Sequence, residues 1–122
     1  YLLHTIGTNT RSLAVDPWTN KYIFPGGVLP VLQQIDAATE GVFILEDLHN
    51  IGTHYDPTLM AWIENLDRHR DEIRALGYDE RFYRMWRYYL LGAAGSDRAR
   101  RNQLWQMVFS KKGLDGGYES IR

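Results

Sequence analysis

The sequence predicts an α/β fold with about three strands and three or more helices. Apolar or β-branched runs at residues 1–6, 42–45 and 103–110 have the length and composition of buried strands. The segments between them repeat apolar residues at helical spacing, so strands and helices alternate along the chain. Of the 122 residues, 44% are hydrophobic and 24% charged, which is the ordinary range for a globular chain that buries a core.

The segment after the first strand predicts a lid. The strand ends at Gly7, and residues 8–28 read as a long loop because Asp16-Pro17 and Pro25-Gly26-Gly27 are turn sequences. Loops of this length inside a compact domain are usually functional or disordered. We therefore expect residues 8–40, the loop and the helix that follows it, to form a lid-like segment.

The middle of the chain predicts a short helix and a short strand. Pro30 opens the helix and Gly41 ends it. The strand at 42–45 ends in a polar cluster at 46–50. Glu46 and Asp47 within it are adjacent, so on a strand they would point to opposite faces and could not act as a paired acid and base.

Two longer helices are predicted next. Asp56-Pro57 has the pattern of an N-cap followed by proline at the first helical position, and Gly77 ends that helix. Asp79 caps the second helix. After the last strand, residues 111–122 are expected to fray.

Charge and cysteine content exclude several classes of function. The net charge of −1 does not favour or disfavour a charged partner, but no basic run is present, so nucleic-acid binding is not expected. The absence of cysteine excludes disulfides and cysteine-ligated metals. His49 and His54 do not complete a zinc pattern, and we expect no metal site. No apolar stretch is long enough to span a bilayer. The chain does not begin with Met and its sheet would be narrow, so a part of a longer protein is expected.

Six stretches, spread over about residues 1–110, carry a family resemblance. They are Leu2-Leu3-His4-Thr5-Ile6-Gly7, Tyr22-Ile23-Phe24-Pro25-Gly26-Gly27, Glu46-Asp47-Leu48-His49-Asn50, Tyr55-Asp56-Pro57-Thr58-Leu59-Met60-Ala61-Trp62, Glu80-Arg81-Phe82-Tyr83-Arg84-Met85-Trp86-Arg87-Tyr88-Tyr89-Leu90 and Gln103-Leu104-Trp105-Gln106. In this order they resemble the C-terminal half of cyclopropane-fatty-acyl-phospholipid synthases and the related mycolic-acid cyclopropane synthases. Residues 1–122 would then be the C-terminal fragment of a single Rossmann-like methyltransferase domain.

The resemblance implies a reaction and a site. These enzymes transfer a methylene group from S-adenosylmethionine to the cis double bond of a phospholipid acyl chain, with bound bicarbonate as the proton acceptor. By the same resemblance, His4, Ile6 and Tyr55 would hold the bicarbonate, and a Cys and a Glu would come from upstream of this chain. Such an anion needs hydrogen-bond donors in a dry pocket, and two far-apart stretches would have to converge there.

The resemblance also implies partners and a location. The glycine-rich cofactor loop is absent, and Pro25-Gly26-Gly27 and Gly116-Gly117 do not replace it, because neither follows a strand and opens a helix. We expect the fragment alone to be inactive and to need the missing N-terminal part. The parent would be cytoplasmic and peripheral to the inner face of the membrane; the sequence leaves its oligomeric state open, with a homodimer as one alternative.

A group of aromatic residues and a group of arginines each allow both a structural and a functional interpretation. Phe24, Phe82, Trp86 and Tyr89 are candidates for an acyl-chain channel, although the last three have the spacing of a helix core. Arg81, Arg84 and Arg87 form either a solvated helix face or a contact for anionic lipid head groups.

Two departures from the family pattern leave alternative functions open. Leu48 stands where the family commonly has Trp, and Asp97 where an aromatic residue is common. They leave open a related methyltransferase acting on another acyl or small amine substrate. A non-catalytic binding or dimerisation module is the third alternative.

Overall fold

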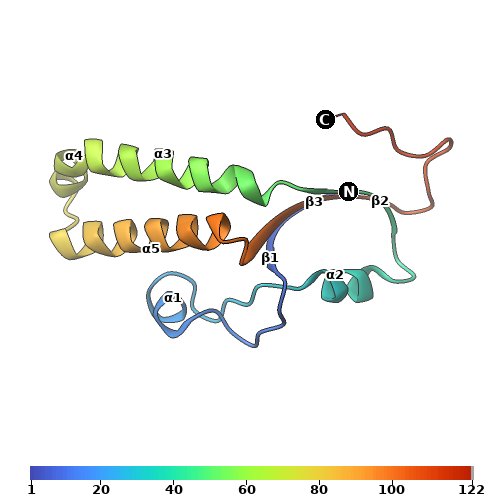
Figure 1. Cartoon of the computed structure of the whole chain (residues 1–122), viewed down its shortest axis with the longest axis horizontal. Helices are drawn as coiled ribbons and strands as arrows, with labels where there is room; N and C mark the ends of the chain where they lie inside the picture. The colour runs from blue at the N-terminus through green and yellow to red at the C-terminus, as the bar shows by residue number, and fades with distance from the viewer. Residues whose placement is uncertain (122) are drawn as a thin grey trace. The chain divides into compact units, whose positions relative to one another are not determined.

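A computed structural model describes residues 1–121 as two compact units. The sheet unit joins Tyr1–Gly52 to the segment that begins at Asn102, and the helical unit is Thr53–Arg101. The elements are β1 (Leu2–Thr8), α1 (Pro17–Tyr22), α2 (Leu32–Thr39), β2 (Ile44–Asn50), a 3-10 turn (Gly52–His54), α3 (Tyr55–Arg68), α4 (Arg70–Ala75), α5 (Glu80–Arg98) and β3 (Asn102–Ser110) (Figure 1). The predicted α/β class with three strands and several helices is confirmed.

The sheet has the order β1-β3-β2, and both outer strands pair antiparallel with β3. The second strand runs over Ile44–Asn50, so its prediction as 42–45 followed by a polar cluster was wrong. The pairing with β3 shifts register between Leu45 and Asp47 and then continues to Asn50. Ladder hydrogen bonds use only backbone groups, so polar side chains on an edge strand do not end the pairing.

The core of the sheet unit lies on one face of the sheet. Alternate residues of the central strand, Trp105, Met107 and Phe109, are at most 5% exposed and pack with Ile35 of α2. Leu3 of β1 and Leu48 of β2 pack against this cluster. The period-two alternation places the side chains on either side of Leu3 on the opposite face of the sheet.

The predicted loop at 8–28 contains a helix that the sequence reading missed. Asp16 caps α1 by accepting hydrogen bonds from the Trp18 and Thr19 amides, both at 3.0 Å, and these bonds, led by those from Thr19, lower the pKa of its carboxyl. The Thr8 amide donates to the Pro30 carbonyl at 2.9 Å and closes the base of the segment.

The helical unit is built on α3 and α5, which lie side by side with α4 at one end (Figure 1). Their shared core consists of Leu59, Ile63, Leu90 and Ala94, each at most 5% exposed. Apolar residues recur at helical spacing in both helices, so each helix buries one face.

The ends of these helices correct two predictions and confirm a third. The first helix begins at Tyr55, so Asp56 lies inside its first turn and is not the N-cap. It is also interrupted at His69, where α3 ends and α4 begins, instead of continuing to Gly77. Asp79 caps α5 by accepting a hydrogen bond from the Phe82 amide at 2.8 Å, as predicted.

The segment after β3 turns back toward β2. The Gly113 amide donates to Ser110 Oγ at 2.9 Å, and Ser120 Oγ donates to Asp47 at 3.4 Å. Tyr118 lines a shallow apolar groove together with Phe43 and Phe109. The fraying expected for residues 111–122 stays a prediction.

Candidate functional site

His4 and Ile6 lie two positions apart on β1 and therefore share the sheet face opposite the core. His4 stands directly across from Gln106 of β3, whose Nε2 is 3.3 Å from His4 Nδ1. When the amide donates this hydrogen bond, the neutral imidazole carries its own proton on Nε2. The predicted His4 donor is thus directed by a neighbour on the central strand.

The backbone N–H of Ile6 is a second hydrogen-bond donor on β1, after the His4 side chain. Tyr1 and Phe109 exchange both of their backbone hydrogen bonds, at 2.9 and 2.8 Å, which sets the phase of the antiparallel ladder. In that phase the odd-numbered residues of β1 bond to β3, and the even-numbered ones direct their N–H groups away from it. The Thr8 amide follows the rule by donating outward to Pro30. The Ile6 N–H is directed to the same outer edge of β1.

Gln106 is a site residue that sequence reasoning missed. It pairs with His4 on one side and with His49 of β2 on the other, so the three side chains form one row across the sheet. The available signal was a polar residue between buried Trp105 and Met107 in an apolar strand.

A partly buried polar cluster fixes the end of β2. Asn50 donates from Nδ2 to Oε1 of Gln103, which is 5% exposed, at 2.6 Å, and it accepts a hydrogen bond from the Gly52 amide at 3.0 Å. A Cβ at Gly52 would lie 3.2 Å from both the Asn50 Oδ1 and the Leu104 nitrogen. The Asn50 side chain and the small size of Gly52 therefore define the turn that leaves the sheet.

Tyr55 is the first residue of α3 and packs against the core of the helical unit. Its ring meets the Trp62 ring edge-on at a centroid distance of 6.4 Å. The neighbouring Asp56 forms a bidentate ion pair with Arg98 at the end of α5, with both N–O distances at 2.8 Å. The Arg98 hydrogen bonds lower the pKa of the Asp56 carboxyl. This pair ties the turn that carries Tyr55 to α5.

The three residues predicted to hold bicarbonate belong to both units: His4 and Ile6 to the sheet unit, Tyr55 to the helical unit. His4 is exposed and Ile6 is 38% exposed. Their convergence on one anion in a dry pocket stays a prediction.

Three of the four channel candidates form a continuous run of rings on α5. Tyr78 stacks on Phe82 at 4.2 Å between centroids, Phe82 meets Trp86 at 6.2 Å, and Trp86 meets Tyr89 at 5.7 Å. Tyr89 also packs against the helical core, and burial raises the pKa of its hydroxyl. Core packing is thus confirmed for Tyr89. Phe24, in the sheet unit, is 52% exposed, and the acyl channel stays a prediction.

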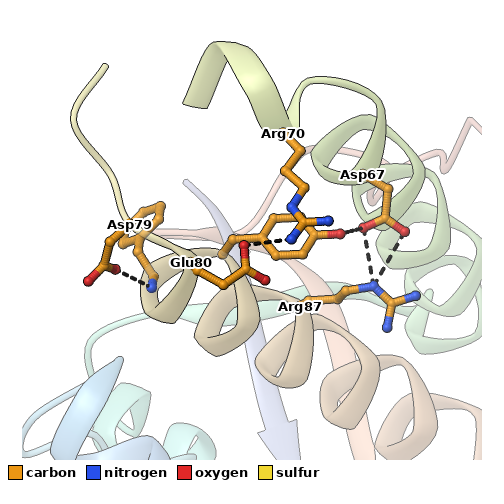
Figure 2. A network of polar contacts seen from close by, with 7 residues as sticks. Asp67, Arg70, Asp79, Glu80 and Arg87 are labelled. Carbon is orange, nitrogen blue, oxygen red and sulfur yellow. Dashed lines mark hydrogen bonds and ion pairs between the residues drawn. The ribbon is translucent and has the colours of Figure 1, made fainter. Parts of the chain in front are cut away.

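A polar network joins α5 to the end of α3 and to α4 (Figure 2). Asp67 accepts a hydrogen bond from the Tyr83 hydroxyl at 2.6 Å and pairs with Arg87 Nε at 3.1 Å. The Tyr83 bond is the main cause that lowers the pKa of Asp67, and it raises the pKa of Tyr83 in turn. Arg70 pairs with Glu80 at 2.6 Å and lies over the Tyr83 ring. Arg87 therefore belongs to this network, although its side chain remains 43% exposed.

The two departures from the family pattern fall at packing positions. Leu48 packs against the core of the sheet unit, and Asp97 is only 8% exposed within α5.

Among the described residues, 1–121, no helix is both long and apolar enough to cross a membrane. No group of three or more His, Asp or Glu side chains among them could hold a metal ion.

Solved structures define the class of fold. The cyclopropane synthase MmaA2 from Mycobacterium tuberculosis matches with a TM-score of 0.79 and 29% identity, over 90% of this chain and 43% of that one. The mycolic acid cyclopropane synthase CmaA1 complexed with SAH and CTAB matches with a TM-score of 0.74 and 26% identity, over 88% and 42%. The fold is that of the S-adenosylmethionine-dependent methyltransferases.

Sequence comparison gives the family. Residues 1–107 match the mycolic acid cyclopropane synthetase family, and the chain belongs to it. The cyclopropane-fatty-acyl-phospholipid synthase of Escherichia coli strain K12 is 52% identical over all 122 residues, which make up 31% of that relative. The chain therefore spans about a third of the length of this curated relative.

Proposed function

We propose that this chain is the C-terminal part of a cyclopropane-fatty-acyl-phospholipid synthase. The whole enzyme would transfer a methylene group from S-adenosylmethionine to the cis double bond of an unsaturated phospholipid acyl chain, acting from the cytoplasmic side of the membrane. The observation that carries the proposal is 52% identity to such a synthase along every residue of the chain.

The described residues do not fit S-adenosylmethionine by themselves. Gly26 and Gly27 follow α1, not a strand, and the glycines after β3 open no helix. The strand–loop–helix phosphate or dinucleotide cradle thus has no counterpart in residues 1–121. The cofactor would be held by the remainder of the protein, and the isolated chain should show no micromolar binding of S-adenosylmethionine by calorimetry.

A small oxyanion fits the donors of this chain better. His4 offers an imidazole N–H that the Gln106 amide orients, and Ile6 offers a backbone N–H directed away from β3. Tyr55 would add a hydroxyl from α3. Bound bicarbonate would supply the base that accepts the proton lost when the ring closes. The three donors would fix it within reach of that proton and take the place of water.

The test uses the full-length protein, unsaturated phospholipid and labelled S-adenosylmethionine. Mass spectrometry should find the label in a cyclopropane ring. Label in a methyl branch would instead assign the second alternative, a related methyltransferase. The absence of any labelled lipid would refute the proposal.

Tyr55→Phe should lower turnover by about 10²-fold, the typical effect of losing one preorganised donor. The free energy of unfolding should change by no more than about 1 kcal/mol, because the ring and its packing remain. Tyr118→Phe, which removes a hydroxyl from the segment after β3, is the matched control and should leave turnover unchanged. Equal turnover for the two variants would remove Tyr55 from the site.

A further inference from the structure

The outward face of α5 carries a stripe with an unusual composition. Its residues recur at helical spacing and all are exposed: Arg81, Arg84, Tyr88, Leu91, Gly92 and Gly95. Tyr88 is 63% exposed and Leu91 is 40% exposed. The buried residues Leu90, Ala94 and Asp97 occupy the other side of the helix, so this outer stripe takes no part in the helical core.

The positive charge of the outer stripe is not neutralised by the two acids of α5. Glu80 lies four residues before Arg84 but pairs with Arg70, and Asp97 is buried on the other side of the helix. Within the described part of the chain, neither Arg81 nor Arg84 lies within ion-pair distance of a carboxylate, whereas Arg87 pairs with Asp67. Arg98 pairs with Asp56 as well, so within residues 1–121 the two arginines of the stripe are the cations of α5 that no ion pair neutralises.

We propose that this outer stripe docks on the surface of an anionic phospholipid bilayer. Arginine side chains extend along a helix while their guanidinium groups reach lipid phosphates. Tyrosine is favoured at the membrane–water interface, where its ring is in apolar surroundings and its hydroxyl is hydrated. Leu91 adds aliphatic area that enters the boundary of the acyl region. The two glycines carry no side chain, and the space above them is open, because an ideal Cβ at either one meets nothing within 4 Å.

The bilayer is favoured over a protein partner by charge complementarity. A contact between two copies of the stripe would bring four unpaired arginines together without an acid to match them, which costs free energy. A surface of anionic head groups offers negative charge opposite both arginines, wherever the helix lies on the bilayer. The inference rests on the proposed function in one respect: a lipid-modifying enzyme has its substrate in such a bilayer.

The experiment measures sedimentation of the 122-residue chain with vesicles of phosphatidylglycerol and phosphatidylcholine, and with phosphatidylcholine alone. We expect binding to the anionic vesicles. Arg81→Gln/Arg84→Gln should weaken the partition coefficient by about 25-fold, from about fivefold per basic residue at an anionic surface. Lys111→Gln/Lys112→Gln removes the same charge from exposed positions after β3 and should change it less than threefold. Leu91→Ser should weaken binding severalfold, and this loss should persist at high salt.

Circular dichroism of each variant verifies that α5 still forms. Equal weakening by the arginine and lysine pairs would overturn the proposal, because attraction would then follow net charge alone. No binding by the wild-type chain, or loss of a dimer in the arginine variant without any vesicle binding, would overturn it as well. Vesicle binding through the stripe without methylene transfer by the full-length protein would refute the proposed function alone. Methylene transfer by the full-length protein, together with no binding of the 122-residue chain to anionic vesicles, would refute the docking alone.

Discussion

Replacing Gly7 by alanine would place a methyl group in space that the Trp105 side chain already occupies. An ideal Cβ at Gly7 lies 2.0, 2.4 and 2.8 Å from the Cζ3, Cη2 and Cε3 atoms of that indole. Ordinary carbon–carbon contact is about 3.5–4.0 Å, so ring and strand would have to separate by roughly 1.5 Å. Gly7 does not have a positive φ angle, so the cost comes from the collision and not from backbone strain.

The size of the effect follows from how little room Trp105 has to move. The residue is 5% exposed, and it packs in one cluster with Met107 and Phe109, which are 1% and 3% exposed. Overpacking a core costs about 1–3 kcal/mol, and a collision with a large ring inside a paired strand belongs at the upper end. We expect Gly7→Ala to lower the free energy of unfolding by about 3 kcal/mol and Tm by roughly 10 °C.

Urea denaturation followed by circular dichroism measures this loss. Gly92→Ala is the matched control, because its Cβ meets nothing within 4 Å and alanine is the better helix former by about 1 kcal/mol. The same substitution should therefore destabilise at Gly7 and stabilise at Gly92. Combining Gly7→Ala with Trp105→Leu should cost less than the sum of the two single changes. A Gly7→Ala midpoint equal to that of the wild type would refute the packing described for this strand.

Three other substitutions test the polar contacts. The Tyr83 hydroxyl is the main cause that holds the pKa of Asp67 below its usual ~3.9, so this pair contributes stability above about pH 4 that is lost as pH falls through the lowered pKa. Asp67→Asn should therefore make the acid limb of urea midpoint against pH shallower, and an unchanged limb would contradict the assignment. Gln106→Leu should convert the single Nε2–H tautomer of His4 into a mixture, read from imidazole 15N chemical shifts; unchanged shifts would show that the amide does not orient the ring. Asp79→Ala should cost about 1 kcal/mol, because it removes the N-cap of α5, and equal midpoints in urea would show that the cap is dispensable.

Local rules predicted the elements whose ends are set by a single residue. Asp79 accepts its capping hydrogen bond, and Gly41 has the positive φ of 70° expected just after a helix. The rules failed where pairing or packing decides. β2 extends through 46–50 because β3 lies beside it, and α3 begins at Tyr55 because that ring joins the helical core. Neither partner is adjacent in sequence.

The candidate site was predictable in part for the same reason. The alternation of a strand places His4 and Ile6 on one face, and the family resemblance names them. The row formed with Gln106 depends on the antiparallel register between residues about 100 positions apart, which no local pattern encodes. The Asn50–Gln103 contact likewise bridges two strands that only the folded sheet brings together.

The sheet order has a consequence for synthesis of the protein. Among the described residues, the strand that both β1 and β2 pair with, Asn102–Ser110, is the last of the three to leave the ribosome. Until it emerges, β1 and β2 lack this hydrogen-bonding partner, while all of Thr53–Arg101 has already been translated. The helices of that middle segment can therefore pair with one another during translation, before the three-stranded sheet of the other unit is complete.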